Sequence, residues 1–268
     1  MPCKYFSIDG VATFVHHTGS TTLPDVPPDL SRGETVVCLH GAGGNGGQFL
    51  DVLAGLAAEH SPLAFDQPAH GRSAGLDSLG SIERMAGFAR ALLGKLGIER
   101  PVLLGHSLGG AVALQCALAA TPPVRALVLV GAVVRNPVPD EYLEFARRLS
   151  EGKERRRFLR EGYAAATPPE ILRRGFMEDM KTDPRATYGD LLAAQACDLS
   201  DALSGLEVPT LVVVGEEEAA PIVAQADLLV ERVGGARKVT IPKAGHMVPI
   251  EQPDALCGAV AGFLRGLE

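Results

Sequence analysis

One serine lies where an apolar run turns into a helical pattern. In "VLLGHSLGGAVAL" (102–114), Ser107 has Gly105 and Gly109 two positions to either side. A serine in a sharp strand–turn–helix holds a strained backbone, and small residues at those positions leave room for the turn. Its hydroxyl then projects above the sheet, and the N–H of Leu108 faces the same space. The pattern therefore indicates a reactive serine rather than one that only caps a helix.

A second glycine pattern indicates a different chemistry. Gly41, Gly43 and Gly46 form G-x-G-x-x-G between an apolar run and a helical pattern. Asp66 follows at the distance, about 20 residues, at which such a motif carries an acid for a ribose hydroxyl. In this motif a pyrophosphate binds at the N-terminus of the helix. Taken alone, the pattern favours a dinucleotide-dependent oxidoreductase.

Elements that could position these residues follow from an alternation along the chain. Apolar runs rich in Val and Leu occupy 35–40, 63–66, 102–107, 126–131, 210–215 and 238–241. Helical patterns occupy 47–59, 82–97, 108–120, 222–233 and 253–266. Strands that are apolar on both faces are typical of parallel sheets covered by helices. We therefore predict an α/β fold with a doubly wound, mostly parallel sheet.

The alternation breaks once, between residues 135 and 198. Only helical patterns occur there, and Asp183 followed by proline is a helix N-cap signal. The sequence thus predicts a core formed by 1–134 and 199–268, with a helical insertion at 135–198. Residues 147–160 are rich in Arg and Lys; we interpret them as a solvated helix face, the alternative being attraction of an acidic substrate.

Composition narrows the class of protein. The chain has 268 residues, 46% of them hydrophobic, and a formal net charge of −7. This charge argues against a general nucleic-acid or anionic-membrane binder. Its apolar runs are too short to cross a bilayer. The five cysteines lack C-x-x-C spacing, which favours free thiols in a reducing compartment, so we expect a cytoplasmic protein.

Four stretches together resemble the α/β-hydrolase family. "HGAGG" (40–44) is similar to its oxyanion loop and "GHSLGG" (105–110) to the turn bearing its nucleophile. "DQPAHGRS" (66–73) resembles its D-x-P-G-H-G-x-S turn, with Ala69 where glycine is usual, and "AGHMVPIEQPDAL" (244–256) the segment bearing its histidine. The match spans nearly the whole chain, and it implies that the insertion is a helical lid after the sixth strand.

The resemblance implies roles for particular residues. Ser107 would be the nucleophile and His246 its base, and the N–H groups of Ala42 and Leu108 would form an oxyanion hole. No cofactor and no metal are implied. The resemblance explains all four motifs, whereas the dinucleotide interpretation leaves the serine and His246 unused. Asp66 is then expected to hold its own turn together with His70.

The resemblance leaves the acid of the triad open among three consecutive glutamates. In the family an aspartate commonly stands three residues after the glycine that closes the seventh strand, which gives Glu218. Counting back from Pro221, which usually follows the acid by four residues, gives Glu217. Glu216, Asp140 and an incomplete triad remain alternatives. We expect Glu218 to be the acid, with Glu217 as the second choice.

The expected activity is hydrolysis of a carboxylic ester, or a related thioester or lactone, of a small or medium substrate through an acyl-enzyme. The family's carbon–carbon bond hydrolases are an alternative, although they typically carry tryptophan where Met247 stands. A hydrolase-fold protein that binds a small ligand without catalysis is a second alternative. The lid is expected to set substrate preference rather than to take part in the chemistry.

Overall fold

The computed structural model describes residues 1–20, 22–119, 121–135 and 138–267. Its strands form one eight-stranded sheet in the order β1-β2-β4-β3-β5-β6-β7-β8. They are β1 (Cys3–Ile8), β2 (Val11–His17), β3 (Thr35–Leu39), β4 (Ser61–Phe65), β5 (Val102–His106), β6 (Ala126–Val130), β7 (Thr210–Gly215) and β8 (Arg237–Ile241). The strands from β3 to β8 pair in parallel, while β2 is antiparallel to both β1 and β4. The predicted mostly parallel α/β sheet is confirmed.

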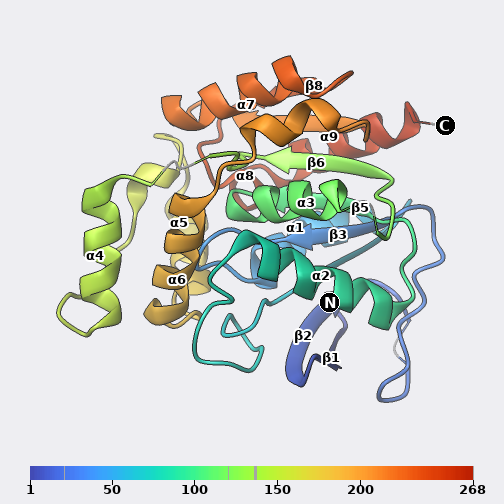
Figure 1. Ribbon diagram of the computed structural model, residues 1–268, viewed down its shortest axis with the longest axis horizontal. Helices are drawn as coiled ribbons and strands as arrows, with labels where there is room; N and C mark the ends of the chain where they lie inside the picture. The colour runs from blue at the N-terminus through green and yellow to red at the C-terminus, as the bar shows by residue number, and fades with distance from the viewer. Residues whose placement is uncertain (21, 120, 136–137, 268) are drawn as a thin grey trace.

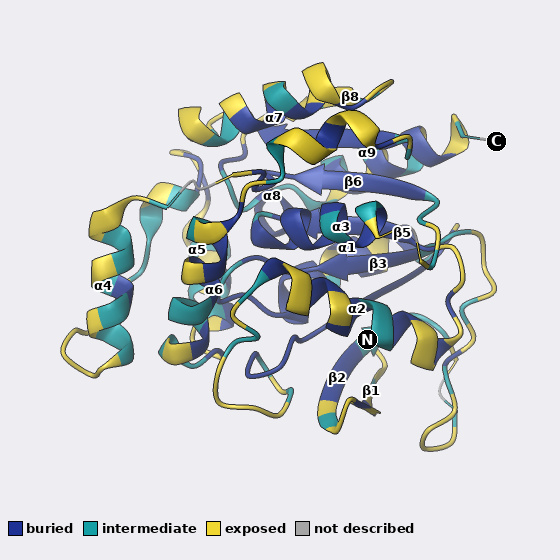
Figure 2. Cartoon of the chain, in the orientation of Figure 1, coloured by how far each residue is buried: buried dark blue, intermediate teal, exposed yellow. Residues whose placement is uncertain are grey.

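Helices cover both faces of this sheet (Figure 1). They are α1 (Leu50–Leu56), α2 (Ile82–Leu96), α3 (Leu108–Leu118), α7 (Ala220–Arg232), α8 (Val248–Glu251) and α9 (Pro253–Arg265). Along β3, Val36 and Cys38 join the core beneath α1 and α9, whereas Val37 and Leu39 join the core beneath α2 and α3. Because both strand faces are buried, the central strands are dark along their whole length in Figure 2.

The N-terminal hairpin β1–β2 was missed by the sequence prediction. Its turn consists of Asp9 (φ 48°) and Gly10 (φ 79°), both with positive φ. Two such residues form the tight turn that matches the twist of antiparallel strands, and Asp-Gly is a common sequence for it. The Asp-Gly pair between two alternating runs was therefore the available signal.

Between β6 and β7, the described residues include the α-helices α4 (Asp140–Ser150), α5 (Pro169–Asp179) and α6 (Pro184–Ala196). Asp183 caps α6 by accepting a hydrogen bond from Arg185 N. Asn136 and Pro137, near the start of the expected insertion, lie outside the described residues. We refer to residues 138–198 as the β6–β7 segment; Figure 1 shows its helices at one end of the sheet.

The basic stretch of this segment only partly forms a solvated helix face. On α4, Arg147 pairs with Glu144 and Glu151 at the surface. Beyond that helix, however, Arg160 donates hydrogen bonds to three consecutive carbonyls starting at Tyr163. Arg156 likewise donates to two carbonyls at and beyond the end of α5. These guanidinium groups satisfy backbone acceptors at the end of α5 and in chain that is not helical.

Candidate active site

Ser107 occupies the strained turn that its glycines predict. It lies between β5 and α3 with φ 54° and ψ −119°, a conformation that L-residues rarely adopt and that is typical of functional sites. A Cβ on Gly105 would overlap the carbonyl of Gly109, and a Cβ on Gly109 would overlap that of Leu39. The two glycines are thus required sterically for the turn that exposes the serine.

His246 lies in the loop between β8 and α8 and contacts a carboxylate. Its Nδ1 is 2.8 Å from Oε2 of Glu218, and the His246 side chain is 24% exposed while that of Glu218 is 1% exposed. An ionised carboxylate only accepts hydrogen bonds, so Nδ1 carries a proton, and in the neutral ring the lone pair then lies on Nε2. His106, the neighbour of Ser107, donates through Nε2 to the His246 carbonyl at 2.8 Å. The histidine loop is thereby fixed beside the serine turn.

The other candidate acids make different contacts. Glu217 Oε2 accepts from Ala165 N at 2.7 Å, in the β6–β7 segment. Glu216 Oε2 accepts from Lys243 N at 3.1 Å. Asp140 lies in the exposed first turn of α4. Of the three glutamates, Glu218 is the one that the structure brings to His246.

Gly131, at the end of β6, is a site residue that the sequence prediction did not single out. It has φ 52°, and a Cβ there would lie 3.0 Å from both Glu218 Oε2 and His246 Nδ1. Any side chain would therefore press on the histidine–carboxylate pair. The signal in the sequence was a glycine directly after the sixth strand, at the second place where the family can carry its acid. Its missing side chain leaves room for the longer glutamate.

The two expected oxyanion donors flank the serine. Gly41 packs so closely that a Cβ there would be 3.0 Å from Ser107 Cβ, which places the following Ala42 beside the serine. Leu108 is the first residue of α3, where a helix leaves its N–H groups unsatisfied. Within the described part of the chain, neither the Ala42 N–H nor the Leu108 N–H has a hydrogen-bond acceptor. Both are available to an oxygen that carries negative charge.

The β6–β7 segment holds in place the loop that was predicted to carry the oxyanion donor Ala42. Gly43 N donates to Oδ2 of Asp190 in α6 at 3.0 Å. Thr182 Oγ1 donates to the carbonyl of Gly44 at 3.1 Å, and Asn45 Nδ2 donates to a carbonyl in α5 at 3.0 Å. These contacts were not anticipated from the sequence, which assigned the segment to substrate preference alone.

Asp66 and His70 both hold the turn of residues 66–73, as expected. Asp66 accepts from Gly46 N and from Arg72 N, both at 2.7 Å, and His70 donates through Nδ1 to the Pro68 carbonyl at 2.9 Å. His70 also places Nε2 2.8 Å from Oδ2 of Asp190. This second contact was not expected, because α6 brings a fully buried carboxylate over the turn from a distant part of the chain.

Ala69 stands where the family usually has glycine, and its backbone is left-handed. Its φ is 69°, which costs a residue with a Cβ about 1–2 kcal/mol. The turn is closed by a hydrogen bond from Ser73 Oγ to the Asp66 carbonyl at 2.6 Å and by one from Ala69 N to the Ala74 carbonyl at 3.0 Å. The departure leaves the turn formed, but with a strained residue.

His40 and His106, which lie in the stretches that resemble the family, hold backbone groups of neighbouring loops. His40 donates through Nδ1 to the Gly41 carbonyl at 2.9 Å and accepts from Gln67 N at 3.1 Å. Burial lowers the pKa of His40 to about 3 and that of His106 to about 3. Both rings are therefore neutral and hold backbone groups of the neighbouring loops.

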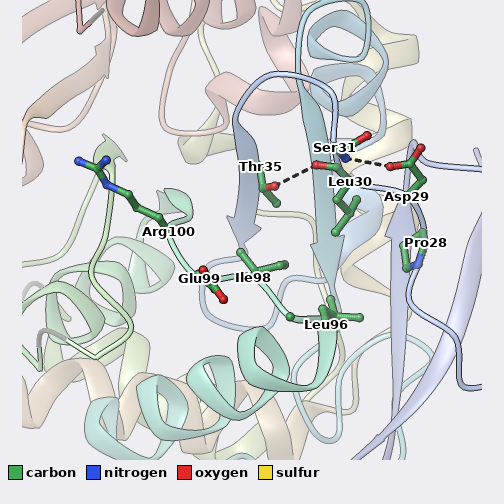
Figure 3. A pocket seen from close by; sticks show the side chains of 10 residues that line it. Pro28, Asp29, Leu30, Ser31, Thr35, Leu96, Ile98, Glu99 and Arg100 are labelled. Carbon is green, nitrogen blue, oxygen red and sulfur yellow. Dashed lines mark hydrogen bonds between the residues drawn. The ribbon is translucent and has the colours of Figure 1, made fainter.

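Two cavities lie away from the serine. One, of about 340 Å³, is lined by Pro28 to Ser31, Thr35 and residues 96–100 (Figure 3). It lies at the amino ends of β3 and β5, whereas Ser107 follows the carboxyl end of β5. Ligands of open α/β sheets bind at the carboxyl ends of the strands, so this cavity is not the candidate active site. The other, of about 240 Å³, is lined by Asp66, Arg72 and Lys181 among others.

The described residues contain no helix that is both long and apolar enough to cross a membrane. Nor do they contain a group of three or more His, Cys, Asp or Glu side chains arranged to hold a metal ion.

Residues 36–259 match the model of the alpha/beta hydrolase family. The chain belongs to this family. It is 31% identical over 247 residues to the pimeloyl-[acyl-carrier protein] methyl ester esterase of Pectobacterium carotovorum, which covers 86% of this chain and 94% of that protein. It is 29% identical to the dihydrolipoyllysine-residue acetyltransferase component of the acetoin cleaving system of Pseudomonas putida, where the match covers 87% of this chain and spans 64% of that protein.

The solved structures of this α/β hydrolase family support the same fold. A thermophilic esterase from Thermogutta terrifontis superimposes with a TM-score of 0.84 at 23% identity, covering 100% of this chain and 99% of that one. Membership of the family is consistent with the strand order and with the turn that carries Ser107.

Proposed function

We propose that the protein is a serine hydrolase that cleaves a carboxylic ester, or a related thioester or lactone, of a small or medium substrate. Ser107 is the nucleophile, His246 the general base and Glu218 the acid. The observation that carries the proposal is the Glu218–His246 contact at 2.8 Å beside a serine turn with φ 54°. It supplies the oriented base that a serine hydroxyl needs to act as a nucleophile.

In the first half of the reaction, His246 Nε2 takes the proton of the Ser107 hydroxyl as the oxygen attacks the acyl carbon. The same nitrogen then returns the proton to the leaving alcohol, and an acyl-enzyme remains. Water, activated by His246, releases the acid in the second half. The Glu218 carboxylate holds the ring in the required tautomer and stabilises its transient positive charge.

The charge on the acyl oxygen is proposed to develop between the N–H groups of Ala42 and Leu108. Neither donor has an acceptor among the described residues, so neither must give up a protein hydrogen bond during the reaction. Donors fixed in advance are worth about 3–4 kcal/mol each in the transition state of comparable enzymes.

Residues 135–198 are proposed to form a lid over a core of 1–134 and 199–268. Phe158 lies 5.3 Å from Tyr163 and 5.9 Å from Phe176 between ring centroids, which supports an apolar cluster inside the segment. Pocket shape in this segment would select the acyl chain. We also propose a cytoplasmic location, since the five cysteines are free thiols.

A panel of p-nitrophenyl esters with graded acyl chains tests the proposal, with wild type compared to Ser107→Ala. We expect saturable hydrolysis by wild type and a loss of about five to six orders of magnitude in kcat for the variant, with the fold intact. If the purified variant keeps a tenth of the wild-type turnover, Ser107 is not the nucleophile. Inactivity of wild type on every ester would favour carbon–carbon bond hydrolysis or ligand binding without catalysis.

A further inference from the structure

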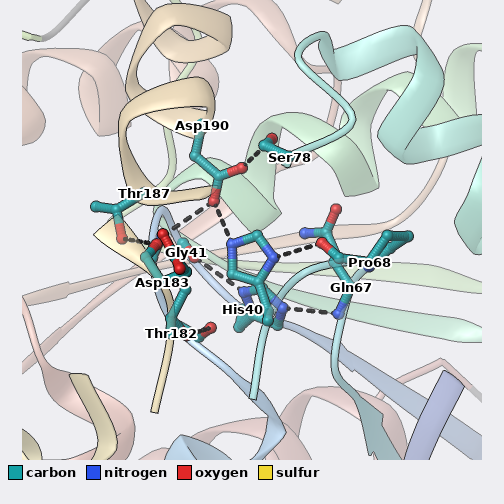
Figure 4. A network of polar contacts seen from close by, with 12 residues as sticks. His40, Gly41, Gln67, Pro68, Ser78, Thr182, Asp183, Thr187 and Asp190 are labelled. Carbon is teal, nitrogen blue, oxygen red and sulfur yellow. Dashed lines mark hydrogen bonds and ion pairs between the residues drawn. The ribbon is translucent and has the colours of Figure 1, made fainter. Parts of the chain in front are cut away.

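Asp190, in α6, contacts side chains and backbone more than 100 positions before it in the sequence (Figure 4). Its Oδ2 accepts from Gly43 N of the oxyanion loop at 3.0 Å and contacts His70 Nε2 at 2.8 Å. Its Oδ1 accepts from Ser78 Oγ at 2.5 Å. The side chain is 0% exposed. A carboxylate buried this completely is costly unless all its contacts are made, so its position must serve the surrounding structure.

The hydrogen-bond partners of the two ring nitrogens determine the protonation state of His70. Its Nδ1 lies 2.9 Å from the Pro68 carbonyl, and its Nε2 faces the Asp190 carboxylate. Both neighbours accept hydrogen bonds only, so both ring nitrogens must carry protons and the ring is an imidazolium. The neighbouring His40 ring, whose centroid lies 4.9 Å from that of His70, is neutral. The Asp66 carboxylate also faces His70.

Electrostatics agree with that protonation state. Burial alone would lower the pKa of His70, but the charge and hydrogen bond of Asp190 outweigh it and raise the pKa. Burial would likewise raise the pKa of Asp190, but the His70 charge and the hydrogen bonds from His70, Ser78 and Gly43 lower it. The two side chains thus form a buried ion pair.

We propose that Asp190, with His70 as its counter-ion, is a positioning residue for the hydrolysis proposed above. By accepting the Gly43 N–H it fixes the peptide that follows Ala42, and so aims the Ala42 N–H at the acyl oxygen. Its effect on rate rests on the proposed function, since an oxyanion donor matters only if an oxyanion forms. The β6–β7 segment thereby takes part in the chemistry through the loop that it holds.

A carboxylate at position 190 meets a requirement that an amide cannot. One oxygen must accept from Gly43 N–H and from a charged His70. In Asp190→Asn, an amide oxygen placed there leaves the imidazolium without a counter-charge. An amide NH2 placed there accommodates a neutral ring but leaves the Gly43 N–H facing a donor. The second arrangement releases the oxyanion loop, and the first replaces a charged acceptor of the Gly43 N–H by a weaker neutral one; neither changes side-chain volume much.

The test compares Asp190→Asn with Asp183→Asn, an exposed acid-to-amide change at the N-cap of the same helix. We expect Asp190→Asn to lower kcat by about 10- to 100-fold with KM within about twofold. Asp183→Asn should match wild type, because asparagine caps helices as well as aspartate does. The affinity of a trifluoromethyl ketone, whose adduct on Ser107 places an oxyanion in the hole, should fall by the same factor as kcat/KM.

Several results would overturn the proposal. They are an unchanged kcat in Asp190→Asn, an equal loss in Asp183→Asn, or a change in KM alone. Failure of the proposed function looks different, because wild type itself would then neither hydrolyse esters nor bind the ketone.

A measurement on wild type keeps the inference open to refutation even if Asp190→Asn does not fold. In spectra of protein labelled with ¹⁵N-histidine, His70 should carry two exchange-protected N–H protons at a pH of about 8, above the ordinary range for histidine. Through-space contacts to Pro68, whose carbonyl faces Nδ1, assign the signals. A singly protonated ring at that pH would contradict the ion pair, whether or not the protein hydrolyses esters.

Discussion

Two histidine–carboxylate pairs in this molecule have the same contact distance and opposite surroundings. Glu218–His246 and His70–Asp190 each place a ring nitrogen 2.8 Å from a carboxylate oxygen. His246 is 24% exposed, whereas His70 and Asp190 are 1% and 0% exposed. The two pairs also differ in the ring nitrogen that does not face the carboxylate. Nδ1 of His70 faces the Pro68 carbonyl, while Nε2 of His246 has no partner among the described residues.

This difference shows that a histidine nitrogen close to a carboxylate oxygen does not by itself identify a catalytic pair. A general base needs a nitrogen that can reach a substrate or a nucleophile, and of these two rings only His246 has a nitrogen without a protein partner among the described residues. His70 has both nitrogens committed, so its proton is held and its charge serves to anchor a loop. What the second nitrogen faces, together with exposure, decides whether such a pair moves protons or holds structure.

The largest expected effect separates the two pairs by activity. Glu218→Gln should lower kcat by about four orders of magnitude, since an amide no longer holds the histidine tautomer or its charge. Glu216 and Glu217 contact backbone N–H groups away from His246. The variants Glu216→Gln and Glu217→Gln should therefore lower kcat by less than about tenfold. Steady-state kinetics on the best ester measures this; equal losses in all three variants would contradict the assignment of the acid.

Stability should respond in the opposite way. His70→Leu leaves the buried Asp190 carboxylate without its counter-ion and should lower the free energy of unfolding by about 3–5 kcal/mol. Glu218→Gln keeps the shape of its side chain and should cost only about 1 kcal/mol. Urea denaturation of the two variants tests this. A smaller loss for His70→Leu than for Glu218→Gln would refute the division of roles.

Crowding the catalytic pair should have an intermediate effect. Gly131→Ala places a Cβ 3.0 Å from both partners of the Glu218–His246 contact, and displacing them should lower kcat by about 100-fold. Gly152→Ala is a matched control, because Gly152 also has positive φ (71°) but a Cβ there meets nothing within 4 Å. Gly152→Ala should introduce the same backbone strain and keep the wild-type kcat. An equal decrease in kcat for the two variants would rule out the steric explanation.

The smallest effect concerns pH and the buried pair. Because the folded-state pKa of His70 is raised, the stability it contributes is fully present below its unfolded value of about 6.5 and is lost as pH rises through the folded value. The stability difference between wild type and Asp190→Asn should therefore be largest near pH 6 and shrink toward higher pH. Asp66 and His40 also face the pair, and the pKa of His40, lowered to about 3, lies below the pH range of the measurement. Thermal melts from about pH 6 to 9 check the sign.

Local patterns predicted most of the sheet and the serine turn. The strands from β3 to β8 and the helices that cover them follow from apolar runs and helical periodicity, and the steric need for Gly105 and Gly109 follows from the turn itself. The Asp9–Gly10 hairpin signal was also local but was overlooked.

Contacts between distant segments could not be predicted in the same way. Which of three consecutive glutamates turns toward His246 depends on how the β7 loop meets the β8 loop, and two residue counts disagreed. The Gly43–Asp190 contact joins residues 147 positions apart, and no periodicity encodes such a pairing. Gly131 matters only because the histidine loop packs on it, which the sequence does not state.

Labelling with a fluorophosphonate tests most directly the central claim that Glu218–His246 is the pair that activates Ser107. Mass spectrometry of the digested protein should find the label on the peptide that contains Ser107. Labelling should be absent in Ser107→Ala, slower by orders of magnitude in Glu218→Gln and close to the wild-type rate in Glu217→Gln. A label on another residue, or equal labelling rates in wild type and Glu218→Gln, would contradict the account.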